Sequence, residues 1–156
     1  PKLKAGDKAP DFSCVGAGLG VVSLAETSGK ARLFNVVPSL DTPVCNKQTH
    51  KFAEELIALG DKVAAYTVSL DLPFAMQRFC TEAKIENLKN LSDVANHSFG
   101  ENYGVLIKGL PIPLLARAVI VVDPHDTIQY IEIVPEIAEE PNYEPALDAL
   151  KKAAGA

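Results

Sequence analysis

A buried strand followed at once by an amphipathic helix, twice in succession, is the feature that most restricts how this chain can fold. ARLFNVVP (31–38) is a compact β-rich run bounded by a proline, and the pattern then changes to helical spacing over residues 43–59. One face of that predicted helix carries Val44, Gln48, Phe52, Leu56 and Leu59. KVAAYTVSL (62–70) repeats the strand, and PFAMQRFCTEAK (73–84) repeats the helix, with Pro73 in its first turn. This repeated strand–helix pattern predicts an α/β fold.

The last third of the chain predicts antiparallel pairing. RAVIVVD (117–123) and TIQYIEIV (127–134) flank a Pro-His-Asp turn and form a predicted β-hairpin. YEPALDALKKAA (143–154) is a predicted amphipathic helix, acidic at its start and basic at its end as the helix dipole favours. The shorter elements expected are a strand at 21–24, a strand at 88–93 and a helix at 95–104 closed by Gly104, after irregular residues 1–12. Together these elements predict a thioredoxin-like α/β fold, with a central mixed sheet flanked by helices on both faces.

Length and composition limit the classes of function. A chain of 156 residues fits one domain, 1–156, and its 47% hydrophobic content can fill a core. A net charge of −5 argues against a nucleic-acid partner. We expect no membrane association and no signal peptide, since no apolar run approaches about 20 residues and PKLKAGDKAPDF lacks an apolar core. Three scattered cysteines favour a reducing compartment, the cytoplasm, over a secreted disulfide scaffold.

One cysteine falls where the first predicted helix begins, in PSLDTPVCNKQTHKF (38–52). Thr42 is the expected N-cap, because its hydroxyl can accept from N–H groups that lack an intrahelical partner, and Pro43 suits the first helical position. Cys45 then takes the third position, where unpaired N–H donors and the helix dipole favour thiolate over thiol. A free cysteine is most often a small core residue, but this setting favours a nucleophile. Asp41 is the alternative cap, which would leave the Thr42 hydroxyl free for the thiolate.

A thiol at this place has several conventional roles, each with its own requirement. A cysteine hydrolase needs a base directed at the sulfur; His50 lies about 140° round the helix from Cys45, so only His97 or His125 could approach through the fold. A structural zinc site and a dithiol reductase both use C-x-x-C, which the sequence lacks. What remains is a single activated thiol with a second cysteine elsewhere. Cys80 lies on the second predicted helix, and a disulfide between the two would require Cα atoms within about 7 Å.

Several stretches resemble one known family. Pro38, Thr42 and Cys45 form the pattern P-x-x-x-T-x-x-C, which resembles the peroxidatic motif of peroxiredoxins. Three further stretches resemble the thiol peroxidase subgroup, the atypical two-cysteine peroxiredoxins: DLPFAMQRFC (71–80), LLARAVIVVD (114–123) and EEPNYEPAL (139–147). The likeness covers nearly the whole chain.

The resemblance implies a role for each matched residue. Cys45 would attack the O–O bond of a hydroperoxide and become a sulfenic acid, and Cys80 would resolve it as an intramolecular disulfide. Thr42 would hydrogen-bond the thiolate and orient the peroxide, and Pro38 would shield the pocket from water. Arg117 would stabilise the thiolate and the polarised peroxide by charge-assisted hydrogen bonds. No cofactor and no metal are implied, because a well-aligned thiolate is sufficient for this chemistry.

The resemblance also implies partners. Family members act on alkyl hydroperoxides and hydrogen peroxide, are recycled by thioredoxin, and are typically homodimers. They generally carry an N-terminal β-hairpin before the segment resembling PKLKAGDKAPDF, where this chain begins. The apolar residues near the motif would suit an organic substrate group or the core equally: Leu40, Val44, Leu72 and Phe74.

Simpler interpretations apply to two residues, and one other function stays open. Cys14 matches no motif, so we expect a small buried or half-buried strand residue without a redox role. Arg117, without the resemblance, would be read as a surface arginine paired with a carboxylate. The non-enzymatic alternative is a redox-sensing or binding module in which a Cys45–Cys80 disulfide alters a surface.

Overall fold

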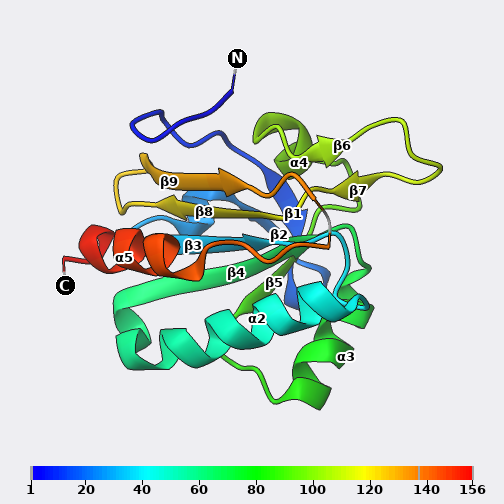
Figure 1. The fold of residues 1–156 in the computed structure, drawn as a ribbon, viewed down its shortest axis with the longest axis horizontal. Coiled ribbons are helices and arrows are strands. Elements are labelled where there is room, and N and C mark those ends of the chain that lie inside the picture. The colour runs from blue at the N-terminus through cyan, green and yellow to red at the C-terminus, as the bar shows by residue number, and fades with distance from the viewer. Residues whose placement is uncertain (1, 137, 156) are drawn as a thin grey trace.

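The computed structural model describes residues 2–136 and 138–155, which form a seven-stranded sheet covered by helices (Figure 1). The strands follow the order β2-β1-β5-β4-β3-β8-β9 across the sheet. Their bounds are β1 Ser13–Val15, β2 Val21–Ser23, β3 Ala31–Val36, β4 Val63–Ser69, β5 Lys89–Ser92, β8 Ala118–Val122 and β9 Ile128–Ile133. A separate two-stranded sheet pairs β6 (Leu106–Ile107) with β7 (Leu114–Leu115).

The α-helices connect these strands. Their bounds are α1 Leu24–Thr27, α2 Pro43–Leu56, α3 Pro73–Ala83, α4 Ser98–Asn102 and α5 Tyr143–Ala153, with 3₁₀ segments at Ala17–Leu19 and Ile57–Lys62. Proline is the first residue of both α2 and α3. A backbone N–H at that position has no partner within the helix, so its absence in proline costs no hydrogen bond.

Strand direction decides where α2 and α3 begin. β3 pairs parallel with β4, and β4 pairs parallel with β5, whereas β8 runs antiparallel to β3 and β9 antiparallel to β8. Since α2 links β3 to β4 and α3 links β4 to β5, both helices start at the same edge of the sheet. The segments that carry Cys45 and Cys80 therefore leave the sheet side by side.

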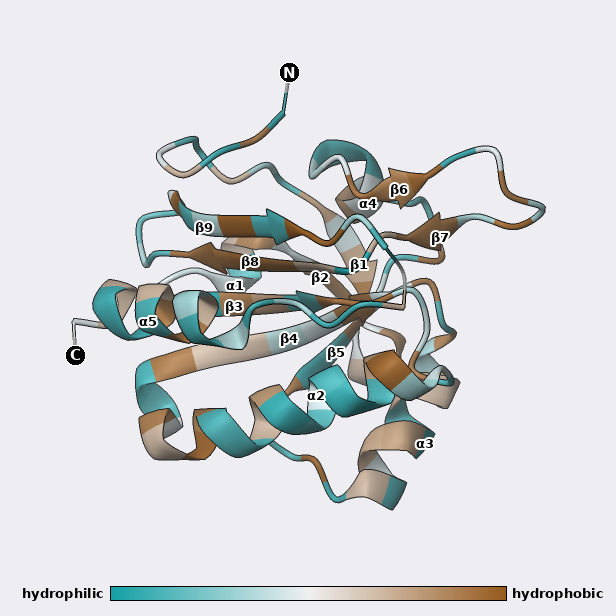
Figure 2. Cartoon of the chain, viewed as in Figure 1, coloured by the Kyte–Doolittle hydropathy of each residue, from teal (hydrophilic) through white to brown (hydrophobic). Residues whose placement is uncertain are grey.

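The alternation of side chains along β3 divides the core into two faces. Leu33 packs on one face with residues of α2, α3 and α5, including Phe52, Cys80 and Leu150. Phe34 points to the other face, where it joins an aromatic cluster with residues of the N-terminal segment, β4 and the α4 region: Phe12, Tyr66, Phe99 and Tyr103. Figure 2 shows β8 and much of β3 as hydrophobic, while α2 carries hydrophilic residues on its outer side. Burial on both sides explains the continuous apolar runs of the central strands.

Most of the predicted elements are confirmed, as is the mixed sheet with helices on both faces. The helix predicted over 43–59 ends earlier, at Leu56, and continues as the 3₁₀ segment. The face predicted for it is also shifted slightly, because Cys45 is fully buried and Val44 only half-buried. Three short strands, β1, β6 and β7, were not among the predicted elements. The single domain over 1–156 stays a prediction, and residue 1 of the irregular start lies outside the described residues.

Candidate active site

Cys45 lies in the first turn of α2, at the edge where β3 and β4 end. β3 stops at Val36 and α2 starts at Pro43, so Cys45 is the third helical residue, as predicted. Its side chain is 0% exposed and packs with Val37, Leu40 and Met76. The free N–H groups and positive partial charge of a helix start suit a sulfur that carries negative charge. The sulfur is thus shielded from solvent at the positive end of the α2 dipole.

Thr42 is the N-cap residue of α2, but its hydroxyl does not cap the helix as predicted. Among the described residues no side chain makes a cap hydrogen bond to α2, so the Asp41 alternative is wrong as well. The Thr42 hydroxyl instead donates to the carbonyl oxygen of Ser39 at 3.0 Å, within the turn that precedes the helix. With its proton committed, the hydroxyl oxygen keeps lone pairs for an incoming donor. Pro38, where this turn begins, is buried as the predicted shield requires.

Arg117 is not the surface arginine of the simpler interpretation. It directly precedes β8, is 1% exposed, and its Nη1 donates to Oε1 of Gln48 at 2.7 Å. Gln48 is three residues beyond Cys45 on the buried face of α2, so the guanidinium is held one helical turn from the thiol. The structure thus places a buried arginine beside the helix that carries Cys45.

Gln48 and Asn35 form a buried amide chain that sequence analysis did not identify as functional. Gln48 Nε2 donates to Asn35 Oδ1 at 2.6 Å, and Asn35 Nδ2 donates to the hydroxyls of Thr49 (3.0 Å) and Thr67 (3.2 Å). All four side chains are fully buried. Each amide therefore has one allowed orientation, which directs the Gln48 carbonyl at Arg117. The available signal was Gln48 itself, a polar residue on the predicted apolar face of the helix.

Cys80 lies on α3, one turn beyond Met76, which packs against Cys45. Residues four apart share a helix face, and Phe79 packs against the clusters of both cysteines. The thiol of Cys80 is 3.4 Å from Asn90 Oδ1, and burial raises its pKa. The three cysteines of the chain are free and buried. Cys80 is therefore a free thiol whose helix, through Met76 and Phe79, also packs against the Cys45 cluster.

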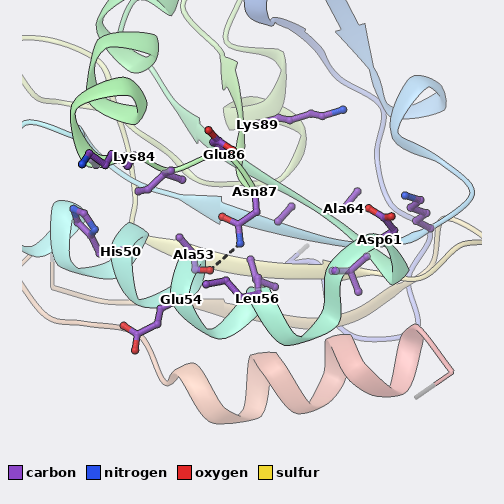
Figure 3. A pocket seen from close by; sticks show the side chains of 17 residues that line it. His50, Ala53, Glu54, Leu56, Asp61, Ala64, Lys84, Glu86, Asn87 and Lys89 are labelled. Atoms are coloured by element: carbon purple, nitrogen blue, oxygen red, sulfur yellow. Dashed lines mark hydrogen bonds between the residues drawn. The ribbon is translucent and has the colours of Figure 1, made fainter.

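Several clefts border these elements, and three of them bear on the site. One of about 770 Å³ lies between α2 and the α3–β5 loop and is lined by His50, Ala53 and Asn87, among others, but by neither cysteine (Figure 3). A second, of about 570 Å³, is bordered by Cys80. A third, of about 410 Å³, is lined by Leu40, Thr42, Pro43 and Phe79 and opens over the start of α2. The last cleft is the one beside the turn that precedes Cys45.

The histidines do not supply the base that a cysteine hydrolase requires. His50 is exposed and meets the ring of Phe79 edge-on, with ring centroids 5.9 Å apart. His97 precedes α4, and His125 lies in the β8–β9 turn. Within residues 2–136 and 138–155 no hydrogen bond joins a histidine to Cys45. Over the same residues no group of three or more His, Cys, Asp or Glu side chains could hold a metal ion.

Cys14 lies in β1 on the opposite face of the sheet, fully buried, as predicted. Its sulfur is 3.5 Å from Asp93 Oδ1, a carboxylate that also accepts from the N–H groups of Phe99 and Gly100. Burial, the charge of Asp93 and this hydrogen bond raise the pKa of Cys14 well above its usual range. Of the three cysteines, Cys14 thus lies in the environment least suited to a nucleophile.

A thiol at a helix start, on a mixed sheet with helices on both faces, defines a class of redox protein, and this chain belongs to the Redoxin family, whose model matches residues 4–147. It is 49% identical over 152 residues to the thiol peroxidase of Halalkalibacterium halodurans, across 97% of this chain and 90% of the relative. It is 46% identical over 150 residues to the thiol peroxidase of Bacillus subtilis, across 96% and 88%. Within the family the chain groups with the thiol peroxidases, which are peroxiredoxin enzymes.

Solved structures agree with this assignment. A peroxiredoxin-like protein from Aquifex aeolicus superposes with a TM-score of 0.89 at 40% identity, covering 98% of this chain and 89% of that one. The thiol peroxidase from Chromobacterium violaceum superposes with a TM-score of 0.86 over 99% and 90% of the two chains, and at 19% identity this likeness concerns the fold alone. The predicted family and thioredoxin-like fold are confirmed. Among the described residues, no helix has the length and apolar character needed to cross a membrane.

Proposed function

We propose that this thiol peroxidase reduces hydroperoxides with Cys45 as its nucleophile. The carrying observation is the position of Cys45, fully buried at the third residue of α2, with Arg117 held one turn away through Gln48. The Cys45 thiolate attacks the terminal oxygen of the hydroperoxide, an S–O bond forms as the O–O bond breaks, and the leaving oxygen takes a proton to become water or an alcohol. Cys45 is left as a sulfenic acid.

The surrounding residues position the peroxide. Thr42 lines the cleft above α2, and its hydroxyl, whose proton is donated to Ser39, can accept the hydrogen bond of the peroxide O–H. Arg117 stabilises the negative charge that moves from sulfur to oxygen in the transition state. Pro38 helps to exclude water from the turn before the helix. Leu40 and Phe79 give the cleft apolar walls, which suit the organic group of an alkyl hydroperoxide.

Cys80 is the proposed resolving residue. Its thiol condenses with the Cys45 sulfenic acid: an S–S bond forms, the S–O bond breaks, and the sulfenic hydroxyl leaves with the thiol proton as water. Burial keeps Cys80 protonated beforehand, so it does not compete for peroxide. Since each cysteine packs on a different cluster, the first turn of α2 or part of α3 opens for the Cα atoms to come within about 7 Å.

The cycle closes when an external dithiol reduces the disulfide, and thioredoxin is the proposed reductant. The proposal retains a homodimer, to which Leu72 (56% exposed) and Phe74 (67% exposed) at the start of α3 offer an apolar surface that a second copy would cover. Of the apolar residues noted near the motif, Leu72 and Phe74 are therefore not core residues, whereas Leu40 is. A cytoplasmic location, where thioredoxin keeps thiols reduced, stays a prediction.

The test is a single-turnover titration of fully reduced protein with tert-butyl hydroperoxide, followed by thiol counting and non-reducing peptide mass spectrometry. We expect rapid loss of two thiols as a Cys45–Cys80 disulfide, no reaction in Cys45→Ser, and a trapped sulfenic acid in Cys80→Ser. Survival of the thiols, or reaction at Cys14, would contradict the proposal. Rapid disulfide formation without turnover by thioredoxin and its reductase would favour the redox-sensing alternative.

A further inference from the structure

Asp71 stands between the two segments that carry the redox cysteines. It follows β4, which ends at Ser69, and precedes α3, which begins at Pro73. Its backbone N–H donates to Ser69 Oγ at 3.1 Å, and its carbonyl oxygen accepts from Ser92 Oγ at 2.6 Å at the end of β5. The residue is thus anchored to the edge of the sheet from which both helices start.

The carboxylate of Asp71 reaches across to the turn before α2. Oδ1 accepts from Ser39 Oγ at 2.9 Å, and Oδ2 accepts from the backbone N–H of Leu40, also at 2.9 Å. Ser69 Oγ adds a third bond to Oδ2 at 2.9 Å. Hydrogen bonds to an ionised acceptor are the stronger kind, and the two from Ser39 and Leu40 join separate segments of the chain.

Ser39 passes this restraint on to the start of α2. Its Oγ accepts from the N–H of Asp41 at 3.2 Å, and its carbonyl oxygen accepts from Thr42 Oγ1 at 3.0 Å. The turn that orients Thr42 and leads into the Cys45 helix is therefore fastened, through one carboxylate, to Asp71, two residues before the Cys80 helix begins. A rearrangement of one segment relative to the other would break these bonds.

We propose that Asp71 is a positioning residue that governs how fast the Cys45 sulfenic acid is resolved. This inference rests on the proposed function. While the Asp71 bonds hold, Cys45 and Thr42 stay in the geometry that reacts with peroxide, and Cys80 is kept away. Opening of the bonds releases the turn and permits disulfide formation. Asp71 thereby sets the balance between the two reactions open to the sulfenic acid.

Those reactions compete for the same intermediate. Condensation with the Cys80 thiol forms the disulfide and releases water. Attack of the sulfenate on a second hydroperoxide forms a second S–O bond, breaks the O–O bond, and yields Cys45 sulfinic acid and an alcohol. The second route needs the closed geometry and the first needs the open one. Weaker Asp71 bonds should therefore protect Cys45 from overoxidation.

The measurement is the concentration of tert-butyl hydroperoxide at which half of Cys45 becomes sulfinic acid, read from intact mass after complete reduction of the protein. We expect Asp71→Ala to raise this concentration about tenfold, as loss of hydrogen bonds to a charged acceptor predicts. Asp71→Asn should stay near the parent, because its carbonyl can accept from Leu40 and Ser69 while its NH₂ donates to Ser39 Oγ. An unchanged Asp71→Ala value, or an Asp71→Asn value equal to it, would overturn the proposal.

Two further variants separate this role from a general loss of stability. Asp126→Ala removes a carboxylate bound by Arg32 and Ser28 at the opposite end of β3, so it should lower stability without moving the overoxidation midpoint. An equal shift in Asp126→Ala overturns the proposal. If Asp71→Ala does not fold, Ser39→Ala decides, with a smaller rise expected and no rise counting against the role of Asp71. If the parent forms no Cys45–Cys80 disulfide at any peroxide concentration, the proposed function itself fails.

Discussion

Replacement of Asn35 by alanine should cost far more stability than its small side chain suggests. Asn35 is 0% exposed and makes three side-chain hydrogen bonds, to Thr49, Thr67 and Gln48. Alanine leaves the Gln48 amide nitrogen buried without its acceptor, which costs about 1–3 kcal/mol, and the vacated volume adds about 1 kcal/mol. We expect a total loss of about 2–4 kcal/mol, and a melting temperature lower by about 5–15 °C for a domain of this size.

The assay is urea unfolding followed by far-UV circular dichroism, since the chain has no tryptophan to report by fluorescence. Asn46→Ala is the control for loss of an asparagine side chain, because Asn46 is exposed on α2 and its removal should change stability by no more than about 0.5 kcal/mol. Peroxide reduction should also fall in Asn35→Ala by about tenfold, because a Gln48 amide that can rotate no longer presents a fixed acceptor to Arg117.

A stability loss below about 1 kcal/mol in Asn35→Ala would refute the reasoning, because it would mean that Gln48 finds another acceptor and its orientation does not depend on Asn35. A full stability loss with unchanged peroxide reduction would separate the two claims. It would leave the amide chain as a structural element and remove it from catalysis.

Three further predictions concern other parts of the molecule. Amide hydrogen exchange over 72–84 should be faster in the disulfide form, since α3 opens for the sulfurs to meet, and equal protection in both forms would contradict this. Burial opposes ionisation of Asp126, but its hydrogen bonds and the charge of Arg32 outweigh burial and lower its pKa. Because the folded pKa lies below the unfolded value of about 3.9, this stabilisation is present above that pH and is lost as the pH falls through the folded pKa. The urea midpoints of the parent and Asp126→Asn should therefore converge in acid, whereas a constant gap would argue against the ion pair. Finally, Cys14→Ala should leave peroxide turnover unchanged, because Cys14 is held against Asp93 away from the site; a clear loss of turnover would reopen its role.

The parts of the fold that sequence analysis predicted are those with strong local periodicity. β3, α2, β4 and α3 each span enough residues for the strand or helix period to be visible, and their boundaries differ from expectation by few residues. β6 and β7 have two residues each, too short for any period. Their pairing depends on the chain between them and on packing against the core, which sequence pattern does not contain.

In the candidate site, too, the features set by local sequence were predictable and those set by the assembled fold were not. The position of Cys45 follows from a proline and a period change within a few residues, so it was predictable. The hydroxyl of Thr42 was assigned to the wrong partner, because a helix cap and a turn carbonyl both lie within its reach. The contact between Arg117 and Gln48 joins residues on different elements, and only the assembled sheet brings them together.

The cores on the two faces of the sheet differ in whether they take part in the proposed opening of α2 and α3. Phe34, Phe99 and Tyr103 stack behind the sheet, with the last two rings 4.2 Å apart, and neither Cys45 nor Cys80 belongs to their cluster. The opening proposed for each turnover thus involves α2 and α3 alone and leaves the aromatic side assembled. In the proposed cycle the central strands keep their pairing, and the opened parts of α2 and α3 return to their helical positions once the disulfide is reduced. Each cycle of the proposed mechanism would then be a local unfolding and refolding of two helix starts on an otherwise intact sheet.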